Sequence, residues 1–283
     1  MAHSIVLSHY QAAPLLAAWK AGERAAMTSP DLGLSTLEVT LADGGVTFPG
    51  GETVRWEDLR RVERARNQCF AVEDGGGVRS IQVFSETTHW LRALMATDGA
   101  PTMLVAGFPM HRIKDTDPWQ DTLKKARAAA PLTGAVLDTA TGLGYTAIAA
   151  ARTAERVVTI ELDPAGLEIA RQNPWSRDLF ANPGIHQIVG DAFAEIQSFA
   201  DGEFARVLHD PPTFSLAGEL YSAAFYRQIY RVLTRTGKLF HYVGDPTSGL
   251  GKRVTSGVVR RLREAGFRRV EPHPEAFGVV AHR

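Results

Sequence analysis

The sequence predicts an α/β protein in which an open sheet with helices on both faces follows a smaller, mostly β region. Three observations support this prediction. In the second half of the chain, short apolar runs alternate with segments of helical pattern. Four of these runs end on an acidic residue, and a glycine-rich turn joins the first run to a helix. Because ligands of open α/β sheets bind at the carboxyl ends of the strands, these acids mark a candidate site.

The glycine-rich turn follows the first predicted strand, Ala135–Leu137. Asp138 stands at the end of that strand, and Gly142 and Gly144 precede a helix predicted over residues 146–152. Glycine lets the backbone turn sharply and lets a ligand approach closely. The helix start also offers unpaired N–H groups and a partial positive charge. Taken alone, two glycines are weak evidence for a ligand site, because an ordinary strand-to-helix turn is the alternative explanation.

The next three strands also deliver acids. Glu161 ends the second strand and lies 19 residues beyond Gly142, close to the spacing at which an acid contacts a ribose in dinucleotide-binding folds. Asp191 ends the third strand. Asp210 ends the fourth and is followed by two prolines. Together, these acids predict one polar edge of the sheet.

These motifs resemble those of the class I S-adenosylmethionine-dependent methyltransferases, which have a Rossmann-like sheet. The resemblance covers roughly residues 131–270 and implies a transferase enzyme whose cofactor is S-adenosyl-L-methionine. Other segments resemble a mostly archaeal family of predicted methyltransferases whose substrate is not assigned. The matching segments are Asp138–Gly144, Glu161, Gly190–Ala192 and Asp210–Pro212 for the wider family, and Asn173–Ser176, His209–Tyr221 and Phe240–Gly244 for the narrower one.

The resemblance also implies cofactor-binding roles. Gly142 and Gly144 pass under the methionine part, whose polar groups Asp138 and Thr141 help to hold. Glu161 accepts hydrogen bonds from the ribose, and two further residues contact the adenine through packing and through its amino group. Carboxylates suit these positions because they only accept hydrogen bonds. The implied cofactor-binding residues are Asp138, Thr139, Thr141, Gly142, Gly144, Glu161, Leu162, Asp191 and Ala192.

The candidate catalytic residues Asp210, Pro211 and Phe214 follow the fourth strand. Two prolines remove backbone donors and stiffen the exit from the strand. The Asp210 carboxylate and the prolyl carbonyls then form a row of acceptors that suits a planar amino group, on whose ring Phe214 stacks. The segment resembles the (Asp/Asn)-Pro-Pro-aromatic motif of amino-group methyltransferases, with Thr213 inserted. Covalent carbon-5 methylation of cytosine is excluded because no cysteine follows Cys69.

Two histidines need separate interpretations. His111 lies in the junction that enters the sheet region, and it either lines the cofactor pocket as a fourth catalytic candidate or belongs to a solvated hinge. His209 precedes Asp210. Because neighbouring side chains of a strand point to opposite faces, His209 is expected to be buried and hydrogen-bonded.

Glycine-rich turns and short alternating runs predict a small, mostly β N-terminal domain over residues 1–105. A connecting segment and helix then span residues 106–130, and the cofactor-binding domain spans 131–283. Spermidine synthase has a similar order of parts, but its glycine-rich loop carries an acid where this chain has Thr-Gly-Leu-Gly. Within the first domain we expect a helix over 5–20, a linker over 22–30, strands at 35–41 and 46–48, a helix over 55–62 and a hairpin over 68–84.

Composition excludes several classes of protein. The chain has 31 basic and 31 acidic residues, so no net charge attracts it to nucleic acid, and RNA is not the favoured partner despite the basic segment 251–283. A single cysteine excludes an internal disulfide. No residues show metal-ligand spacing, so no metal is expected. No run has membrane-spanning length and no leader pattern is present, which predicts a cytoplasmic protein.

The sequence therefore predicts a methyltransferase that acts on an amino group or other heteroatom of a small molecule or nucleobase. One alternative uses the same cofactor for aminopropyl or aminocarboxypropyl transfer, or for cyclisation, with release of methylthioadenosine. Another is a protein that binds the cofactor or RNA without turnover. The sequence does not name the acceptor, and it leaves open whether the protein is a homodimer.

Overall fold

The computed structural model describes residues 5–214 and 216–283. The chain divides into two compact units: the first comprises Met1–Trp119 with Ala165–Arg177, and the second Gln120–Pro164 with Asp178–Arg283. The boundaries predicted from the sequence, at residues 105 and 130, stay predictions.

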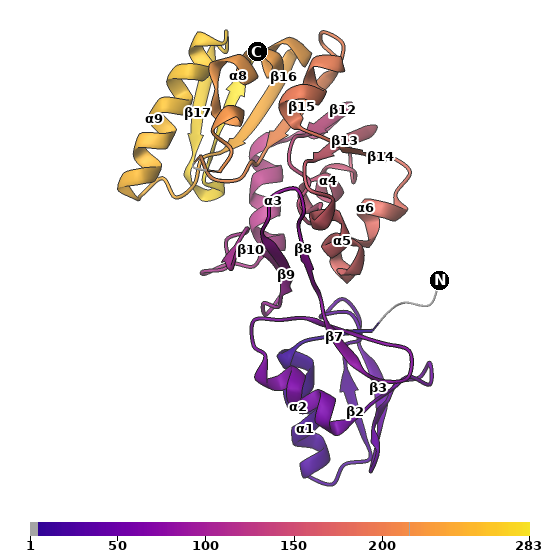
Figure 1. Cartoon of the computed structure of the whole chain (residues 1–283). Helices are drawn as coiled ribbons and strands as arrows, with labels where there is room; N and C mark the ends of the chain where they lie inside the picture. The colour runs from indigo at the N-terminus through magenta and orange to yellow at the C-terminus, as the bar shows by residue number, and fades with distance from the viewer. Residues whose placement is uncertain (1–4, 215) are drawn as a thin grey trace. The chain divides into compact units, whose positions relative to one another are not determined.

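The first unit packs two helices, α1 and α2, around a core shared with short strands (Figure 1). Trp19 of α1 stacks on Trp56 of α2 with ring centroids 4.2 Å apart, and the Trp56 indole donates to the Ala42 carbonyl at 2.9 Å. These helices begin and end at His9–Lys20 (α1) and Trp56–Arg64 (α2). Three antiparallel sheets accompany them: β2-β3-β4-β5, β1-β6-β7 and β11-β10-β9-β8. Their bounds are Val6–Leu7 (β1), Ala25–Thr28 (β2), Leu37–Ala42 (β3), Gly45–Thr47 (β4), Thr53–Val54 (β5), Phe70–Val72 (β6), Val78–Ser80 (β7), Gln82–Phe84 (β8), Leu91–Met95 (β9), Thr102–Val105 (β10) and Phe108–Pro109 (β11).

Three expectations for this unit were wrong in detail. The first helix begins at His9 rather than residue 5, because Ser8 caps it through a reciprocal capping box with Gln11. The expected linker over 22–30 contains β2, which pairs with β3. The expected hairpin strand over 78–84 divides at Ile81 into β7 and β8, which belong to different sheets. Local pattern did not distinguish these cases, because pairing partners lie outside the segment.

The second unit is built on a seven-stranded sheet of order β14-β13-β12-β15-β16-β18-β17. Strands β12 to β16 are parallel to one another, and β18 is antiparallel to both β16 and β17. Successive residues Val136 and Leu137 of β12 are both fully buried, so both faces of the sheet are covered. This confirms the predicted Rossmann-like fold. The strand bounds are Ala135–Asp138 (β12), Arg156–Glu161 (β13), Ile185–Val189 (β14), Phe204–His209 (β15), Leu233–Tyr242 (β16), Arg269–His273 (β17) and Gly278–His282 (β18).

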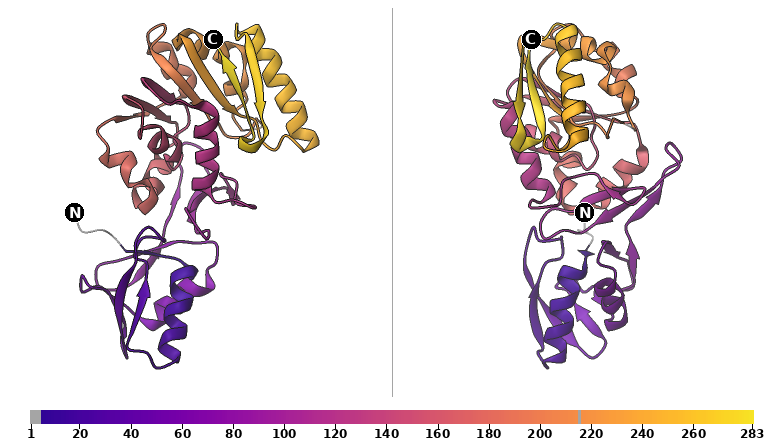
Figure 2. Two further views of the ribbon diagram at one scale, coloured as in Figure 1. Left: turned by 180° about the vertical axis from the view of Figure 1, so that it is seen from behind. Right: turned by 90° about the vertical axis from the view of Figure 1, so that its left-hand side faces the viewer.

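Helices pack against this sheet (Figures 1 and 2), and a large apolar cluster joins α8 and α9 to the strands. Phe225 and Ile229 of α8 and Leu262 of α9 belong to it. The last helix, α9, begins at Gly249, because Ser248 caps its start by accepting from the Gly251 amide. The helix bounds are Pro118–Ala129 (α3), Tyr145–Ala150 (α4), Arg177–Ala181 (α6), Ala192–Glu195 (α7), Ala223–Val232 (α8) and Gly249–Glu264 (α9), with 3₁₀ turns at Ile196–Ser198, Gly218–Tyr221 and Pro274–Ala276. Helix α5 (Pro164–Gln172), apart from its first residue, and the 3₁₀ turn Pro174–Ser176 belong to the first unit.

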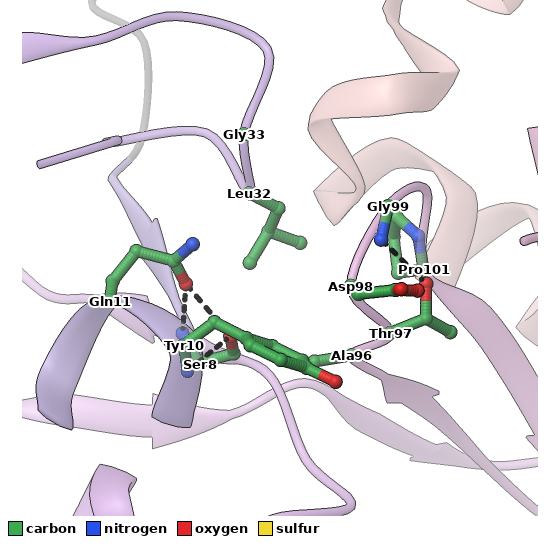
Figure 3. A pocket seen from close by; sticks show the side chains of 10 residues that line it. All are labelled: Ser8, Tyr10, Gln11, Leu32, Gly33, Ala96, Thr97, Asp98, Gly99 and Pro101. Atoms are coloured by element: carbon green, nitrogen blue, oxygen red, sulfur yellow. Dashed lines mark hydrogen bonds between the residues drawn. The ribbon is translucent and has the colours of Figure 1, made fainter.

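A small cavity of about 80 Å³ lies beside the start of α1 in the first unit (Figure 3). Its wall includes Ser8 and Gln11, whose side chains hydrogen-bond to each other, and the turn at Thr97–Gly99. A cavity of this size with polar groups in its wall has room for water.

Candidate active site

The candidate site lies where the strand order of the second unit reverses. β12 is flanked by β13, which follows it in the chain, and by β15, which comes three strands after β12. Asp138, Glu161 and Asp210 stand at the carboxyl ends of these three strands. Ligands of open α/β sheets bind at this switch point. The structure therefore brings the acids of the first, second and fourth predicted strands to one edge.

Asp138 is completely buried beneath this edge. Its Oδ2 accepts from the hydroxyls of Thr159 at 2.9 Å and Thr146 at 3.0 Å. Its Oδ1 is buried and has no hydrogen-bond partner within residues 5–214 and 216–283. Burial raises the pKa of Asp138 to about 7; the two threonines oppose this rise and the Asp210 carboxylate adds to it. A buried oxygen without a partner is costly, so Oδ1 is suited to a ligand that donates a hydrogen bond.

The turn after β12 requires its glycines. Gly142 and Gly144 have φ values of 53° and 76°, in the left-handed region that glycine favours. A Cβ at Gly144 would also lie 2.6 Å from the Leu179 side chain. The Gly142 amide donates to Glu161 Oε2 at 2.8 Å, which ties the turn to the next strand. Thr141 is buried, and its hydroxyl hydrogen-bonds that of Thr159 at 2.6 Å.

Two further carboxylates are oriented by backbone amides. Glu161 accepts from Gly142 through Oε2 and from Asp163 through Oε1, at 3.0 Å. Asp191 caps α7, accepting through Oδ1 from the amides of Phe193 and Ala194. Asp191 is an exposed residue. Ala192 is buried behind it, while Leu162, next to Glu161, keeps 50% of its surface exposed.

Asp210 is held by a buried lysine that the sequence analysis missed. Lys125 of α3 places Nζ 2.6 Å from Asp210 Oδ2 and 3.1 Å from Asp121 Oδ2. The sequence contained one indication of the ion pair between Lys125 and Asp121, because an acid and a lysine stand four residues apart on a predicted helix. Its burial and its contact with Asp210, 85 residues away, depend on the tertiary fold. Thr146 and Thr159 were missed for the same reason.

The segment after Asp210 folds back on itself. Pro211 is buried, and the Pro212 carbonyl accepts from the Tyr221 hydroxyl at 3.0 Å. One of the expected prolyl acceptors is therefore already engaged within the protein. Phe214 meets Tyr221 edge to face at 5.5 Å, and half of its surface is exposed. Phe214 thus offers an aromatic surface near Asp210.

His209 is fully buried, as the strand alternation predicts. Its Nε2–H donates to the Leu220 carbonyl at 2.9 Å, which leaves Nδ1 to accept from the Thr139 hydroxyl at 2.6 Å. Burial lowers the pKa of His209 to about 3, so the ring is neutral at physiological pH. His209 and Thr139 therefore connect the glycine-rich turn to the end of the Asp210 segment.

His111 lies in the first unit, with its Nδ1 3.0 Å from the Thr102 hydroxyl. The other candidate residues lie in the second unit. In the part of the chain that the structure describes, no cluster of three potential metal ligands occurs, and no helix is long and apolar enough to cross a membrane.

Comparison with known proteins agrees with this geometry. A family model for a methyltransferase domain matches residues 137–241. The uncharacterized protein MJ1233 of Methanocaldococcus jannaschii is 44% identical over 238 residues, which are 83% of this chain and 80% of that protein. The chain belongs to the MJ1233 family. The polyamine aminopropyltransferase of Mycobacterium tuberculosis is 34% identical over 122 residues, but these are 40% of this chain and 22% of that protein.

Solved structures with the same fold include spermidine synthase in complex with the transition state analogue AdoDATO, at a TM-score of 0.60 and 18% identity, covering 71% of each chain. MNMC2 from Aquifex aeolicus has a TM-score of 0.52 and 19% identity, over 67% of this chain and 70% of that one. The methyltransferase domain makes this member of the MJ1233 family a transferase enzyme that uses S-adenosyl-L-methionine. The residues fit that cofactor, because a buried carboxylate oxygen without a partner and a left-handed glycine turn stand at the switch point.

Proposed function

We propose that the protein methylates an amino group or other heteroatom of a small molecule or nucleobase. The observation that carries this proposal is the Asp210 carboxylate at the switch point. Its Oδ2 is held by Lys125, while its Oδ1 has no partner among the described residues. An acceptor-only group beside a stiff Pro-Pro segment suits an N–H donor. Phe214 supplies a surface on which a planar acceptor can stack.

The cofactor would be held by the edge formed from β12, β13 and β14. We assign its polar methionine groups to Asp138 Oδ1 and to the turn at Thr139–Gly144, its ribose hydroxyls to Glu161, its adenine ring to Leu162, and its adenine amino group to Asp191 with Ala192 behind. When bound, S-adenosylmethionine would supply an activated methyl carbon for transfer to the acceptor. Each assignment matches an acceptor to a donor or an apolar surface to a ring.

The acceptor would be positioned by Asp210, Pro211 and Phe214. Asp210 Oδ1 accepts the N–H of the acceptor, which orients the nitrogen lone pair and favours loss of the proton as the new bond forms. Pro211 is buried and fixes the direction in which the segment leaves β15. For His111, pocket lining and a structural role with Thr102 both remain as hypotheses, which His111→Ala would distinguish by its effect on turnover.

A second candidate is transfer of an aminopropyl or similar chain. It is favoured by the spermidine synthase fold, which covers 71% of this chain, and by the partial sequence match to an aminopropyltransferase. Against it, the glycine-rich turn is Thr141-Gly-Leu-Gly144 and lacks an acid between the glycines.

The fate of the cofactor separates the two reactions. The protein is incubated with S-adenosylmethionine and a cell extract of its host, and the products are identified by mass spectrometry. Formation of S-adenosylhomocysteine with a methylated acceptor supports methyl transfer. Formation of methylthioadenosine shows that the carbon chain has left the sulfur, and the second candidate then replaces the first.

A further inference from the structure

Lys125 is enclosed on three sides in the second unit. Only 4% of its side chain is exposed. Its ammonium contacts Asp121 on the preceding turn of α3 and Asp210 at the end of β15, and it lies 4.5 Å from the ring centroid of Tyr242 on β16. The ammonium donates a hydrogen bond to Asp210, forms an ion pair with Asp121 and makes a cation–π contact with Tyr242. The ammonium therefore has one defined position among three elements.

The two carboxylates differ in their surroundings. Asp121 has no exposed side-chain surface, whereas Asp210 keeps 19% exposed. Burial alone would lower the pKa of Lys125, but Asp210 and Asp121 together raise it above its ordinary value, so the ammonium stays charged. Asp121 balances that charge inside the protein, and Asp210 connects it to the site.

The contact selects one oxygen of Asp210. The terminal torsion of an aspartate is broad, so an unrestrained carboxylate presents either oxygen in many directions. Here Oδ2 is fixed by a charge-assisted bond of 2.6 Å, and Oδ1 has no hydrogen bond or ion pair in the described part of the chain. Once Oδ2 is fixed, the direction of the Oδ1 lone pairs is fixed as well.

We propose that Lys125 is a positioning residue that holds Asp210 through Oδ2, so that Oδ1 faces the N–H of the acceptor. This inference rests on the proposed function, in which Asp210 contacts the acceptor. Lys125 itself contacts neither acceptor nor cofactor in this scheme. An ion pair that only stabilises the fold would show the same contacts. The test therefore needs measurements that do not change when only the stability of the protein changes.

The test variant is the double substitution D121N/K125M. Lys125→Met alone would remove the cation that balances the buried Asp121 carboxylate, and breaking a buried ion pair in this way is strongly destabilising. The double variant removes both buried charges and retains the packing volume. The matched control is Arg156→Met, which breaks an ion pair with Glu203 of the same 2.6 Å length at the amino end of β13, the opposite edge of the same sheet.

Three measurements are made on the full chain: binding of S-adenosylhomocysteine by calorimetry, kcat with S-adenosylmethionine and the acceptor fraction from the extract, and the carboxyl ¹³C signal of Asp210, assigned by its loss in Asp210→Asn. In D121N/K125M we expect affinity within about twofold of the wild type and kcat lower by roughly 100-fold, the scale of a 1 Å misplacement. The Asp210 signal should move. In Arg156→Met, kcat and the Asp210 carboxyl signal should both keep their wild-type values.

The outcomes separate the two proposals. An unmoved Asp210 signal in D121N/K125M overturns the positioning role whatever the reaction is. A moved signal with wild-type kcat, while Asp210→Asn is inactive, also overturns it and leaves the proposed function standing. Wild-type kcat in Asp210→Asn overturns the role of Asp210 in the proposed function, and the assignment of Lys125 with it.

Discussion

Cofactor affinity should depend on pH through Asp138. In the unliganded protein this carboxyl is buried, and its pKa is about 7, against an ordinary value of 3.8. We propose that its Oδ1 accepts a hydrogen bond from the cationic end of the cofactor, which requires the ionised form. Binding below pH 7 must therefore displace a proton. The apparent Kd should rise about tenfold for each pH unit below 7, or about 1.4 kcal/mol per unit.

The same group should affect stability in the opposite direction. Because the folded-state pKa is raised, the folded protein holds this proton more tightly than the unfolded chain does. The stabilisation is fully present below about pH 4 and is lost as pH rises through about 7. The shift corresponds to roughly 4 kcal/mol of unfolding free energy across that range. Asp138→Asn removes the titration, so the difference between wild type and variant isolates this contribution from other carboxyls.

The assay is isothermal titration calorimetry with S-adenosylhomocysteine between pH 5 and 9, in two buffers of different ionisation enthalpy. Wild type should release about one proton at pH 6 and almost none at pH 9. Asp138→Asn should bind more weakly at pH 9 and lose most of the pH dependence. If the variant keeps the wild-type pH profile, Asp138 is not the titrating group. If wild-type affinity falls as pH rises through 7, the neutral acid is the binding form and the reasoning is wrong.

Two further substitutions test the cofactor edge and the turn. Glu161→Ala should raise the Kd for S-adenosylhomocysteine by roughly 10- to 100-fold, the loss expected for a charged hydrogen-bond acceptor. The control is Glu168→Ala, because Glu168 lies on the exposed surface of α5. Equal affinity of the two variants would contradict the assignment of Glu161 to the ribose. Gly144→Ala should destabilise the protein by about 2 kcal/mol or more in urea unfolding, because alanine is strained at a φ of 76° and its Cβ meets Leu179. Its control is Gly218→Ala, whose Cβ meets nothing within 4 Å, and two equally stable variants would contradict the expected strain.

The sheet could be predicted because its signals are local. Runs such as Ala135–Asp138 and Val157–Glu161 are short, mostly apolar and separated by helices, and each ends on an acid that stands at the site edge. The Asp138–Gly144 turn was predictable because glycine is needed where φ is positive. The burial of His209 followed from strand alternation.

The supporting contacts could not be predicted because they join distant residues. The contact between Lys125 and Asp210 depends on the packing of α3 beside the end of β15. The pKa of Asp138 depends on complete burial between Thr146 and Thr159, which no local pattern encodes. In the first unit, β2 was missed because Ala25–Thr28 is a strand only through its pairing with β3.

The central claim is that a methyl group reaches an acceptor heteroatom beside Asp210. The most direct measurement uses S-adenosylmethionine with a deuterated methyl group, host extract, and either wild type or Asp210→Ala, followed by mass spectrometry. We predict that wild type transfers the label to a nitrogen or other heteroatom of one acceptor and forms S-adenosylhomocysteine. Asp210→Ala should bind S-adenosylhomocysteine as wild type does but transfer no label. Label recovered in methylthioadenosine, or transferred equally by Asp210→Ala, would contradict the claim.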